Sequence, residues 1–592
     1  MQYAILADTF AKLEATRKRL QMIDILTELF REIPKDKIRR VVYFTSGKVY
    51  PDYLDFDLGL ADKMVIRAIS KAVGKTELTI ETLYKQLGDL GETAENLLES
   101  SRQKSLDAFM PLPEKIKKKR LTVEEVWETL DKITQTTGKG STSKKIGYLS
   151  RLYLKAEPLE AKYITRTVLS QLRLGVKDLT IIEALSRAFG ETDQARPPIE
   201  HAYNIRSDIG EVAEILVKEG LAGVKKIGIQ LGRPIRMMAA QRIGSIEEIL
   251  EKLGGKCALE FKYDGERVQA HIGKEVHLFS RNLNDITTMY PDVAQSLRAT
   301  INAKQAIVEG EITAWNPEDE TFEPFQKLMS RKRKYDIDEA MAAIPVKVFL
   351  FDILYLNGHS LLSTSYPERR ETLESLVREG DKIIPAAQKT VNSSRDFEEY
   401  FETALEYGCE GVMAKDVREE TPYQAGNRGF LWIKHKFDYS SAFVDSYDLV
   451  VVGGFHGKGK RRGLLGTVLM AAYNPTEERF ETVCKLGSGF TDEDLERVTK
   501  DLKQIQTATQ PQDVYSKLEP DIWVYPEKVF EIQGADLSTS PVHTCALGEL
   551  KQDAGIAIRF PRFTRYREDK SAEQATTTEE ILQAFHNQRS QN

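Results

Sequence analysis

The sequence predicts a multidomain protein with an all-α N-terminal domain, an α+β central domain and a small C-terminal β-barrel. From Met1 to about Gly210, apolar residues recur at three- and four-residue steps, as in ILTELFREI and YITRTVLSQLRL, which is typical of amphipathic helices. From about Ala258 to Phe437, short β-rich runs such as CALEFKY and VKVFLFDIL alternate with helical runs such as ERRETLESLV. Beyond Phe437, short strands separated by glycine turns favour a small barrel.

The length and the connecting segments indicate where the domains divide. A chain of 592 residues suggests about three to five units at roughly 100 to 200 residues each. Residues 225–238, KKIGIQLGRPIRMM, combine glycines, a proline and basic residues, as in a connection between domains. We therefore predict domains at residues 1–215, 216–437 and 438–592. A capping-box pattern from Thr577 to Glu580 predicts a closing helix.

Composition and charge exclude several classes of protein. Hydrophobic residues make up 41% and charged residues 29%, the balance of a globular chain rather than a disordered one. No apolar run approaches the ~20 residues of a membrane span, and the N-terminus lacks the pattern of a signal peptide. We expect a cytoplasmic protein without a membrane partner. The net charge of -6 argues against a wholly basic nucleic-acid coat.

The cysteines do not form a metal-binding or redox pattern. Cys257, Cys409, Cys484 and Cys545 lie far apart, and no CxxC spacing occurs. We therefore expect four ordinary thiols.

The segment EFKYDGER, residues 260–267, contains a lysine in an unusual setting. Lys262 lies where a predicted strand meets a turn, within an apolar and acidic stretch. A nucleophilic lysine must lose its proton, and burial together with nearby cations destabilises the charged form. Most lysines in strands are surface residues or salt-bridge partners, so the wider pattern has to decide.

KYDGER resembles the KxDGxR signature of covalent nucleotidyltransferases, in which the lysine takes up a nucleoside monophosphate as a phosphoramidate. Further motifs follow in family order: SRN at 280–282, VEGE at 308–311, FLFD at 349–352, EGVMAK at 410–415 and WIKHK at 432–436. The segments 521–523, 540–541, 559–562 and 569–570 resemble the barrel domain of ATP-dependent DNA ligases of the archaeal and eukaryotic type. The resemblance covers nearly the whole chain.

This resemblance implies a DNA-binding domain, a nucleotidyltransferase (adenylation) domain and an OB-fold domain, in that order. It implies an ATP-dependent DNA ligase that seals nicks between a 3′-hydroxyl and a 5′-phosphate in replication, repair and recombination. Lys262 would carry AMP and pass it to the DNA. ATP and Mg²⁺ are the implied cofactors, nicked duplex DNA is the implied partner, and we expect a monomer.

Two lysines and two carboxylates are candidates for the triphosphate and its metal. Lys434 and Lys436 lie two apart on a predicted strand, so they project from one face and can neutralise phosphate oxygens. Glu311 and Glu410 are single acids in apolar strands, and paired carboxylates beside phosphates commonly hold Mg²⁺. The resemblance implies that one of these acids contacts the nucleotide's ribose instead, and we also assign Glu311 to nucleotide binding. An acid that faces water is the alternative for each of them.

The remaining nucleotide contacts depend largely on the resemblance. Phe351 would stack on adenine, and Glu260, an acceptor when ionised, would take a hydrogen bond from the exocyclic amine and so favour ATP over GTP. A core aromatic remains the alternative for Phe351. Family arginines that hold the ribose, the nick phosphate and the nucleotide pocket resemble Arg267, Arg281 and Arg428 respectively.

The last motif is rich in arginine. Guanidinium groups suit β- and γ-phosphates, and a barrel that swings over the nucleotide could orient pyrophosphate and then leave. The residues that we assign to pyrophosphate orientation are Arg559, Arg562, Asp569 and Lys570.

Local basic islands could contact DNA phosphates without reading sequence. They are residues 115–120, 139–145 and 331–334, and the segment 172–175 also resembles the family's DNA-binding domain. From these segments and the SRN motif we select Lys144, Lys145, Arg173 and Arg281 as DNA contacts. A solvated charged face is the alternative for each island.

The segment from Gln103 to Phe109 resembles the short segments by which archaeal ligases engage the sliding clamp. An ordinary amphipathic turn is the alternative.

Three other functions are less compatible with the sequence. NAD-dependent ligases resemble a layout with a four-cysteine zinc module, which the scattered cysteines cannot supply. RNA ligases and capping guanylyltransferases would share the lysine motif without the long helical N-terminal region. A non-catalytic DNA-end scaffold would have no need of the lysine, the carboxylates and the C-terminal arginines together.

Overall fold

The computed structural model describes residues 1–54, 56, 58–107, 120–190, 194–243, 245–317, 321–323, 325–331, 337–378, 380–436, 445–457, 463–534 and 536–590. These form two compact units: residues 1–75 with 94–437, and residues 76–93 with 438–592. The predicted division at residues 215 and 437 stays a prediction. Helix α12 (Ile209–Val224) runs through the first of these positions.

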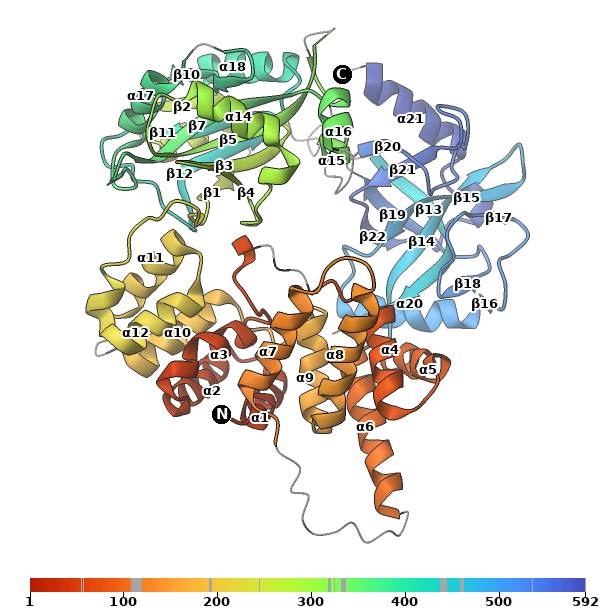
Figure 1. The fold of residues 1–592 in the computed structure, drawn as a ribbon. Coiled ribbons are helices and arrows are strands. Elements are labelled where there is room, and N and C mark those ends of the chain that lie inside the picture. The colour runs from red at the N-terminus through yellow and green to blue at the C-terminus, as the bar shows by residue number, and fades with distance from the viewer. Residues whose placement is uncertain are drawn as a thin grey trace. The chain divides into compact units, whose positions relative to one another are not determined.

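Helices fill the N-terminal part of the first unit (Figure 1). Fully buried aromatic side chains such as Phe10, Phe30 and Phe44 form its core. Helix starts follow the expected chemistry, since Thr122 and Glu125 form a capping box. Besides α12, the helices are α1 (Tyr3–Glu14), α2 (Arg19–Glu32), α3 (Ile38–Thr45), α4 (Asp62–Val73), α6 (Leu90–Asp107), α7 (Val123–Thr134), α8 (Ser141–Lys155), α9 (Pro158–Val168), α10 (Asp178–Phe189) and α11 (Arg196–Arg206), with η1 (Lys35–Lys37) and η2 (Asp52–Leu54).

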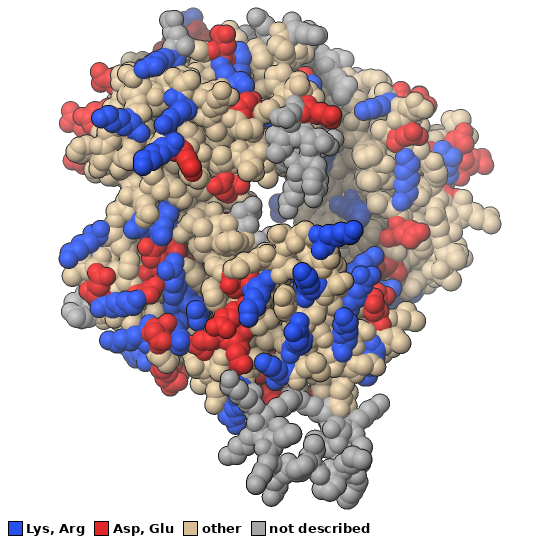
Figure 2. Space-filling model, viewed as in Figure 1, with Lys and Arg blue, Asp and Glu red and all other residues tan. Residues whose placement is uncertain are grey.

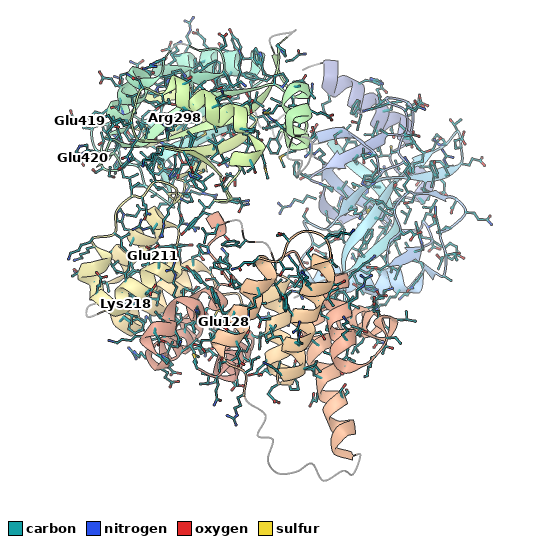
Figure 3. All side chains as sticks on the ribbon, in the orientation of Figure 1. Glu128, Glu211, Lys218, Arg298, Glu419 and Glu420 are labelled. Atoms are coloured by element: carbon teal, nitrogen blue, oxygen red, sulfur yellow. The ribbon has the colours of Figure 1, made fainter. Side chains whose placement is uncertain are left out.

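The connecting segment, residues 225–238, is hydrogen-bonded to strand β3 (Glu266–Ile272). The Gln269 side chain accepts from the Ile235 amide at 2.7 Å and donates to its carbonyl at 3.0 Å. Glu211 of α12, labelled in Figure 3, pairs with Arg233 of this segment. The segment is therefore an ordered connection.

Two sheets form the α+β part of the first unit. One has the strand order β1-β12-β11-β2-β10, and the other has β4-β3-β5-β7-β8, with β6 beside β5 and β9 beside β7. The strands are β1 (Ala239–Arg242), β2 (Cys257–Phe261), β3 (Glu266–Ile272), β4 (Val276–Ser280), β5 (Ala306–Asn316), β6 (Thr321–Phe322), β7 (Val346–Leu356), β8 (His359–Ser360), β9 (Ile383–Pro385), β10 (Gln388–Val391), β11 (Gly411–Asp416) and β12 (Arg428–Lys436). The helices are α13 (Ile246–Lys252), η3 (Thr287–Met289), α14 (Pro291–Thr300), α15 (Phe325–Ser330), α16 (Ile337–Ala343), α17 (Tyr366–Leu376) and α18 (Ser394–Glu406).

An apolar cluster joins the two sheets next to Lys262. Leu259 of β2 and Ile433 of β12 pack in the same cluster as Phe349 of β7. The ring of Tyr263 stacks on that of Phe349, with centroids 4.0 Å apart. The chain that leaves β2 through Lys262 is thus held where the sheets meet.

The second unit contains the strand-rich C-terminal part. Its sheet has the order β16-β18-β13-β14-β15-β17, and β19 pairs with both β13 and β22. Its elements are α5 (Glu77–Leu87), β13 (Asp445–His456), β14 (Leu465–Asn474), β15 (Arg479–Leu486), α20 (Asp492–Gln504), β16 (Gln506–Thr507), β17 (Val514–Tyr515), β18 (Ile522–Val524), β19 (Val529–Gly534), β20 (Asp536–Ser540), β21 (Gly555–Arg559), β22 (Arg562–Tyr566), η5 (Ala572–Gln574) and α21 (Thr578–Ser590).

Strand β13 pairs with three other strands of this sheet. Its first half pairs with β19 and its second half with β18, while β14 lies along its other edge. The register shifts between Val451 and Gly453, where an added Cβ on Gly453 would lie 2.5 Å from Pro520. A glycine at a bulge is the expected device for such a bend.

Several predictions from the sequence are confirmed. The predicted strands correspond to β2, β3, β4, β5, β7, β11, β13, β14, β15 and β19. The capping box holds, because the Glu580 amide donates to Thr577 Oγ1 and the Thr577 amide donates to the Glu580 carboxylate. The four cysteines are free and buried.

Surface charge and hydropathy add two observations. Figure 2 shows positive and negative side chains interspersed on the face that it draws, as expected for the mixed composition. No helix in the described part of the chain has both the length and the apolar character that crossing a bilayer would require.

Candidate active site

Lys262 follows β2 directly, and its backbone is bonded on both sides. Its amide donates to the Gly411 carbonyl at 2.8 Å, and its carbonyl accepts from the Glu410 amide at 2.9 Å. The side chain is 22% exposed, and Nζ lies 2.6 Å from Glu410 Oε2. The lysine is therefore held in a polar, partly enclosed position and remains accessible to a substrate.

Glu410 connects this lysine to a second one. Lys436 Nζ also lies 2.6 Å from Glu410 Oε2, because the pairing of Gly411 with Lys436 brings the start of β11 beside the end of β12. Burial opposes ionisation of Glu410, but the charges of Lys262 and Lys436 outweigh it and lower its pKa to about 2. Glu410 is thus ionised at neutral pH.

Glu311 lies in the same electrostatic neighbourhood. It is the register partner of Arg267 across β3 and β5. Burial raises the pKa of Glu311 to about 7; Lys262 and Arg267 oppose this rise, and Glu410 and Asp264 add to it. The two candidate metal carboxylates therefore differ strongly in their readiness to ionise.

Asp264 is a third acid here that the sequence predictions left without a role. Burial and then the Glu410 carboxylate raise its pKa, whereas Lys262 lowers it. Its place in the KYDGER motif was the available signal.

Several cationic side chains lie near Lys434. Burial lowers the pKa of Lys434, and Lys436, Lys262, Arg428 and Arg281 lower it further. The structure therefore brings four of the predicted nucleotide and DNA contacts near the predicted nucleophile Lys262; they come from β12 and the residue that follows β4. Such a concentration of positive charge suits a polyphosphate.

Of the two predicted base contacts, Glu260 is buried and Phe351 is partly buried. Glu260 lies 2.6 Å from Lys415 Nζ and 3.4 Å from Arg370, and Tyr366 donates to it. The ring of Phe351 meets that of Trp432 edge-on at 5.9 Å. Glu260 thus already accepts from protein donors, which the sequence did not indicate.

Arg267 is positioned by buried groups. Its guanidinium lies 2.8 Å from Glu309, donates to the Met238 carbonyl at 2.7 Å and lies over the Phe351 ring at 5.4 Å. Tyr423 donates to Glu309 at 2.9 Å. Arg267, which is predicted to contact the ribose, is therefore hydrogen-bonded to the connecting segment at Met238.

Within the described ranges, no group of three or more His, Cys, Asp or Glu side chains could hold a metal. Two carboxylates are nevertheless the donor set that Mg²⁺ commonly uses together with substrate phosphates. Burial is the main cause of the raised pKa of Glu311, and the Glu410 carboxylate adds to the rise, so the two acids lie near enough to interact. The residues fit a metal completed by the substrate.

Comparisons with known proteins identify the family of this chain. The family models for the DNA ligase N terminus, the ATP-dependent DNA ligase domain and the ATP-dependent DNA ligase C-terminal region match residues 2–186, 237–436 and 461–570. "DNA ligase 2" of Thermofilum pendens is 47% identical, over 100% of this chain and 98% of the relative. The DNA ligase of Saccharolobus solfataricus is 45% identical, over 99% and 98%.

The chain belongs to the ATP-dependent DNA ligases. The predicted family and activity are thus confirmed. A solved structure titled "Pmar-Lig_Pre." covers 95% of this chain and 99% of its own, with a TM-score of 0.55 and 19% identity. This likeness supports the predicted fold class.

In this ligase the C-terminal motif lies in the barrel unit. Arg562 and Asp569 are exposed, whereas Arg559 and Lys570 are partly buried. Asp569 pairs with Arg567 at 2.8 Å, and Lys570 pairs with Asp448 at 2.6 Å.

The predicted DNA contacts of the ligase differ in exposure. Lys144 is exposed, but Lys145 is buried and its Nζ donates to the Leu58 carbonyl at 2.8 Å. Lys145 is therefore engaged by the protein itself. Arg331, in a predicted basic island, is also buried and pairs with Asp292, so its role is structural.

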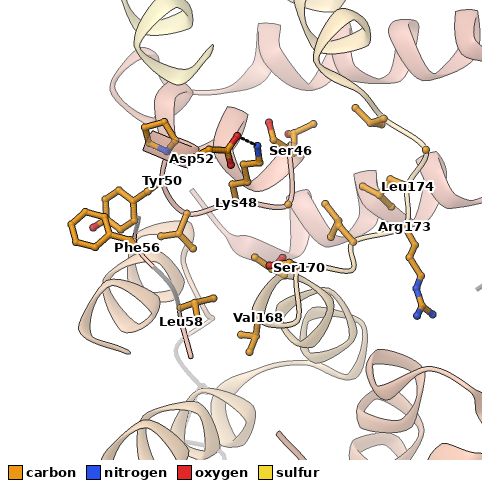
Figure 4. Close-up of a pocket in the computed structure, with 18 of the residues that line it drawn as sticks. Ser46, Lys48, Tyr50, Asp52, Phe56, Leu58, Val168, Ser170, Arg173 and Leu174 are labelled. Carbon is orange, nitrogen blue, oxygen red and sulfur yellow. Dashed lines mark hydrogen bonds and ion pairs between the residues drawn. The ribbon is translucent and has the colours of Figure 1, made fainter. Parts of the chain in front are cut away.

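Arg173 lines a cavity of about 620 Å³ formed mainly by residues 45–58 and 167–176. In Figure 4 its side chain extends away from the pair of Lys48 and Asp52. Its backbone has φ 57°, in the left-handed region.

Parts of three other predicted segments lie outside the described residues. Residues 115–119 and 332–334 lie outside the described residues. So do Phe109 and the side chain of Gln103, which leaves the clamp segment a prediction.

Proposed function

We propose that Lys262 is the nucleophile of this ATP-dependent DNA ligase. Its Nζ would attack the α-phosphorus of ATP, forming a P–N bond while the P–O bond to pyrophosphate breaks. The observation that carries the proposal is the position of Nζ, 2.6 Å from Glu410 and among the cations of β12. The cations of Lys434 and Lys436 would stabilise the phosphate oxygens during this attack.

The later steps use the same groups. A 5′-phosphate oxygen of the DNA would take AMP from Lys262, breaking the P–N bond. The 3′-hydroxyl would then attack that 5′-phosphate, forming the phosphodiester and releasing AMP. Arg281 and Arg428 are exposed and both act on the pKa of Lys434, and they would contact the nick and the nucleotide respectively.

Mg²⁺ would be held by Glu311 and Glu410 with phosphate oxygens of the substrate. When bound, it supplies neutralisation of charge on the phosphates. Glu260 would accept from the adenine amine and Phe351 would stack on the base, which favours ATP over GTP. Both side chains lie near Lys415, whose Nζ is 2.6 Å from Glu260 and 4.8 Å from the centre of the Phe351 ring.

The remaining parts of the proposal concern partners and setting. The ligase would act as a cytoplasmic monomer on nicked duplex DNA in replication, repair and recombination. Lys144 and Arg173 would contact phosphates, and residues from Gln103 to Phe109 would engage the sliding clamp. In the first step, the barrel would bring Arg559, Arg562, Asp569 and Lys570 to the pyrophosphate.

The test is to supply α-labelled ATP, GTP or adenylate-labelled NAD, followed by nicked duplex. Label should enter the protein from ATP alone and then move to the DNA 5′-phosphate. Charging from NAD, or label that never reaches the nick, would contradict the proposal.

DNA contacts can be tested by salt. Each phosphate contact contributes about 0.9 to the slope of log affinity against log salt. Lys144→Ala should reduce that slope by about one, whereas a slope equal to the wild type's would remove Lys144 from the interface.

A further inference from the structure

Asp448 of β13 gathers two cations of the C-terminal motif, although the sequence predictions assign it no role. Arg567 Nη1 donates to both of its carboxylate oxygens, at 2.8 and 2.7 Å. Lys570 Nζ donates to Oδ2 at 2.6 Å. The Asp448 side chain is 12% exposed, against 65% for Asp569. Asp448 is therefore much more enclosed than Asp569.

The sheet places Asp448 there. Asp448 is the register partner of Glu531 in β19, and Glu531 is the partner of Arg565 in β22. The chain that leaves β22 stays on this sheet, because the Arg567 amide donates to the Val529 carbonyl at 2.8 Å. Backbone pairing therefore fixes both the acid and the motif.

The backbone of Asp448 is bonded a second time. Its amide donates to Thr576 Oγ1 at 3.0 Å, and its carbonyl accepts from the Thr576 amide at 2.8 Å. The carboxylate thus has little freedom to follow its partners if they move.

Arg567 links Asp448 to Asp569. Its Nε and Nη2 donate to the two oxygens of Asp569, at 2.9 and 2.8 Å, while Nη1 is bonded to Asp448. The hydrogen bond from Arg567 lowers the pKa of Asp569. A planar guanidinium with donors on two sides is suited to hold two carboxylates in one arrangement.

We propose that Asp448 is a positioning residue for the charging of the enzyme with AMP. It holds Lys570 directly and Asp569 through Arg567, and an ammonium has three donors, of which this pair uses one. The inference rests on the proposed role of the motif in orienting pyrophosphate. Pyrophosphate leaves only in the charging step, so Asp448 acts on that step and not on sealing.

The experiment compares two reactions of the full-length Asp448→Asn variant. Charging of Lys262 from labelled ATP should slow on the order of tenfold, because misplaced groups lose rate steeply. Sealing of a nick already adenylated at its 5′-phosphate should keep the wild-type rate. Asp448→Glu, which restores the charge, should recover part of the charging rate.

A control in the same unit is Glu477→Gln. Glu477 pairs with Arg479 at 3.6 Å, outside the motif, and both reactions should be unchanged. Melting temperatures of all variants are measured alongside.

Two results would overturn the inference. If Asp448→Asn slows both reactions equally and lowers the melting temperature, the residue is structural. If it charges normally while Asp569→Asn and Lys570→Met charge slowly, the motif does not depend on Asp448. Normal charging by all three variants would instead defeat the proposed role of the motif itself, and the inference with it.

Discussion

The buried cluster around Glu260 in the first unit and the C-terminal motif of the second are both charge clusters, but they are built differently. In the buried cluster, Lys415 and Glu260 are 1% and 3% exposed. In the motif, Arg567 and Asp569 are 17% and 65% exposed. Removing one partner of a buried pair leaves an uncompensated charge, whereas an exposed pair is solvated and screened. Breaking the ion pair around Glu260 should therefore cost more stability than breaking an exposed pair of the motif.

The largest expected effect comes from Lys415→Met. The Glu260 carboxylate would keep only Arg370 as a cationic neighbour at 3.4 Å, so the first unit should lose about 3 kcal/mol of stability. Thermal or denaturant unfolding measures this loss.

Its matched control is Lys252→Met, which removes an exposed pair with Glu248 at 3.7 Å. Unfolding of this variant should be unchanged. Equal effects of both substitutions would show that burial does not separate the two kinds of pair.

A smaller, pH-dependent effect is expected for Glu311→Gln. The folded pKa of Glu311 is raised to about 7, so the folded state holds its proton more tightly, and stability falls as the pH rises from about 4.5 through 7. Gln cannot ionise. The metal-free variant should therefore be more stable than the wild type by about 1–2 kcal/mol at pH 8, with little difference at pH 4.

Unfolding at both pH values checks this prediction. A stabilisation equal at pH 4 and pH 8 would mean that the ionisation of Glu311 is not its source.

The smallest effect is expected in the barrel unit. Glu568 pairs with Arg497, and the two side chains are 75% and 52% exposed. Glu568→Gln should leave the melting temperature unchanged within error, because exposed pairs contribute little. A clear drop in the melting temperature would show that this exposed pair stabilises the protein as a buried pair does, which would contradict the contrast between the two regions.

Much of the fold followed from local patterns. Alternating apolar runs predicted strands such as β5 and β7, and the Thr577 capping box predicted the start of α21, because both depend on nearby residues. The predicted boundary at residue 215 falls within α12 and stays a prediction.

The site was predicted in part. The motifs located Lys262, Glu410 and Lys436, and in the structure each lysine Nζ lies 2.6 Å from Glu410 Oε2. The pairing of β11 with β12 brings Lys436 there. Contacts between distant segments were missed, since no local pattern marks Asp448 for Lys570. For the same reason the basic loop did not reveal that Lys145 turns inward to Leu58.

The most direct test is to locate the AMP adduct. The protein is charged with ATP, digested, and its peptides analysed by mass spectrometry under conditions that preserve the P–N bond. We predict AMP on Lys262 alone, no adduct in Lys262→Ala, and slower charging of the same residue in Lys436→Ala. An adduct on another lysine, or one that persists in Lys262→Ala, would contradict the account.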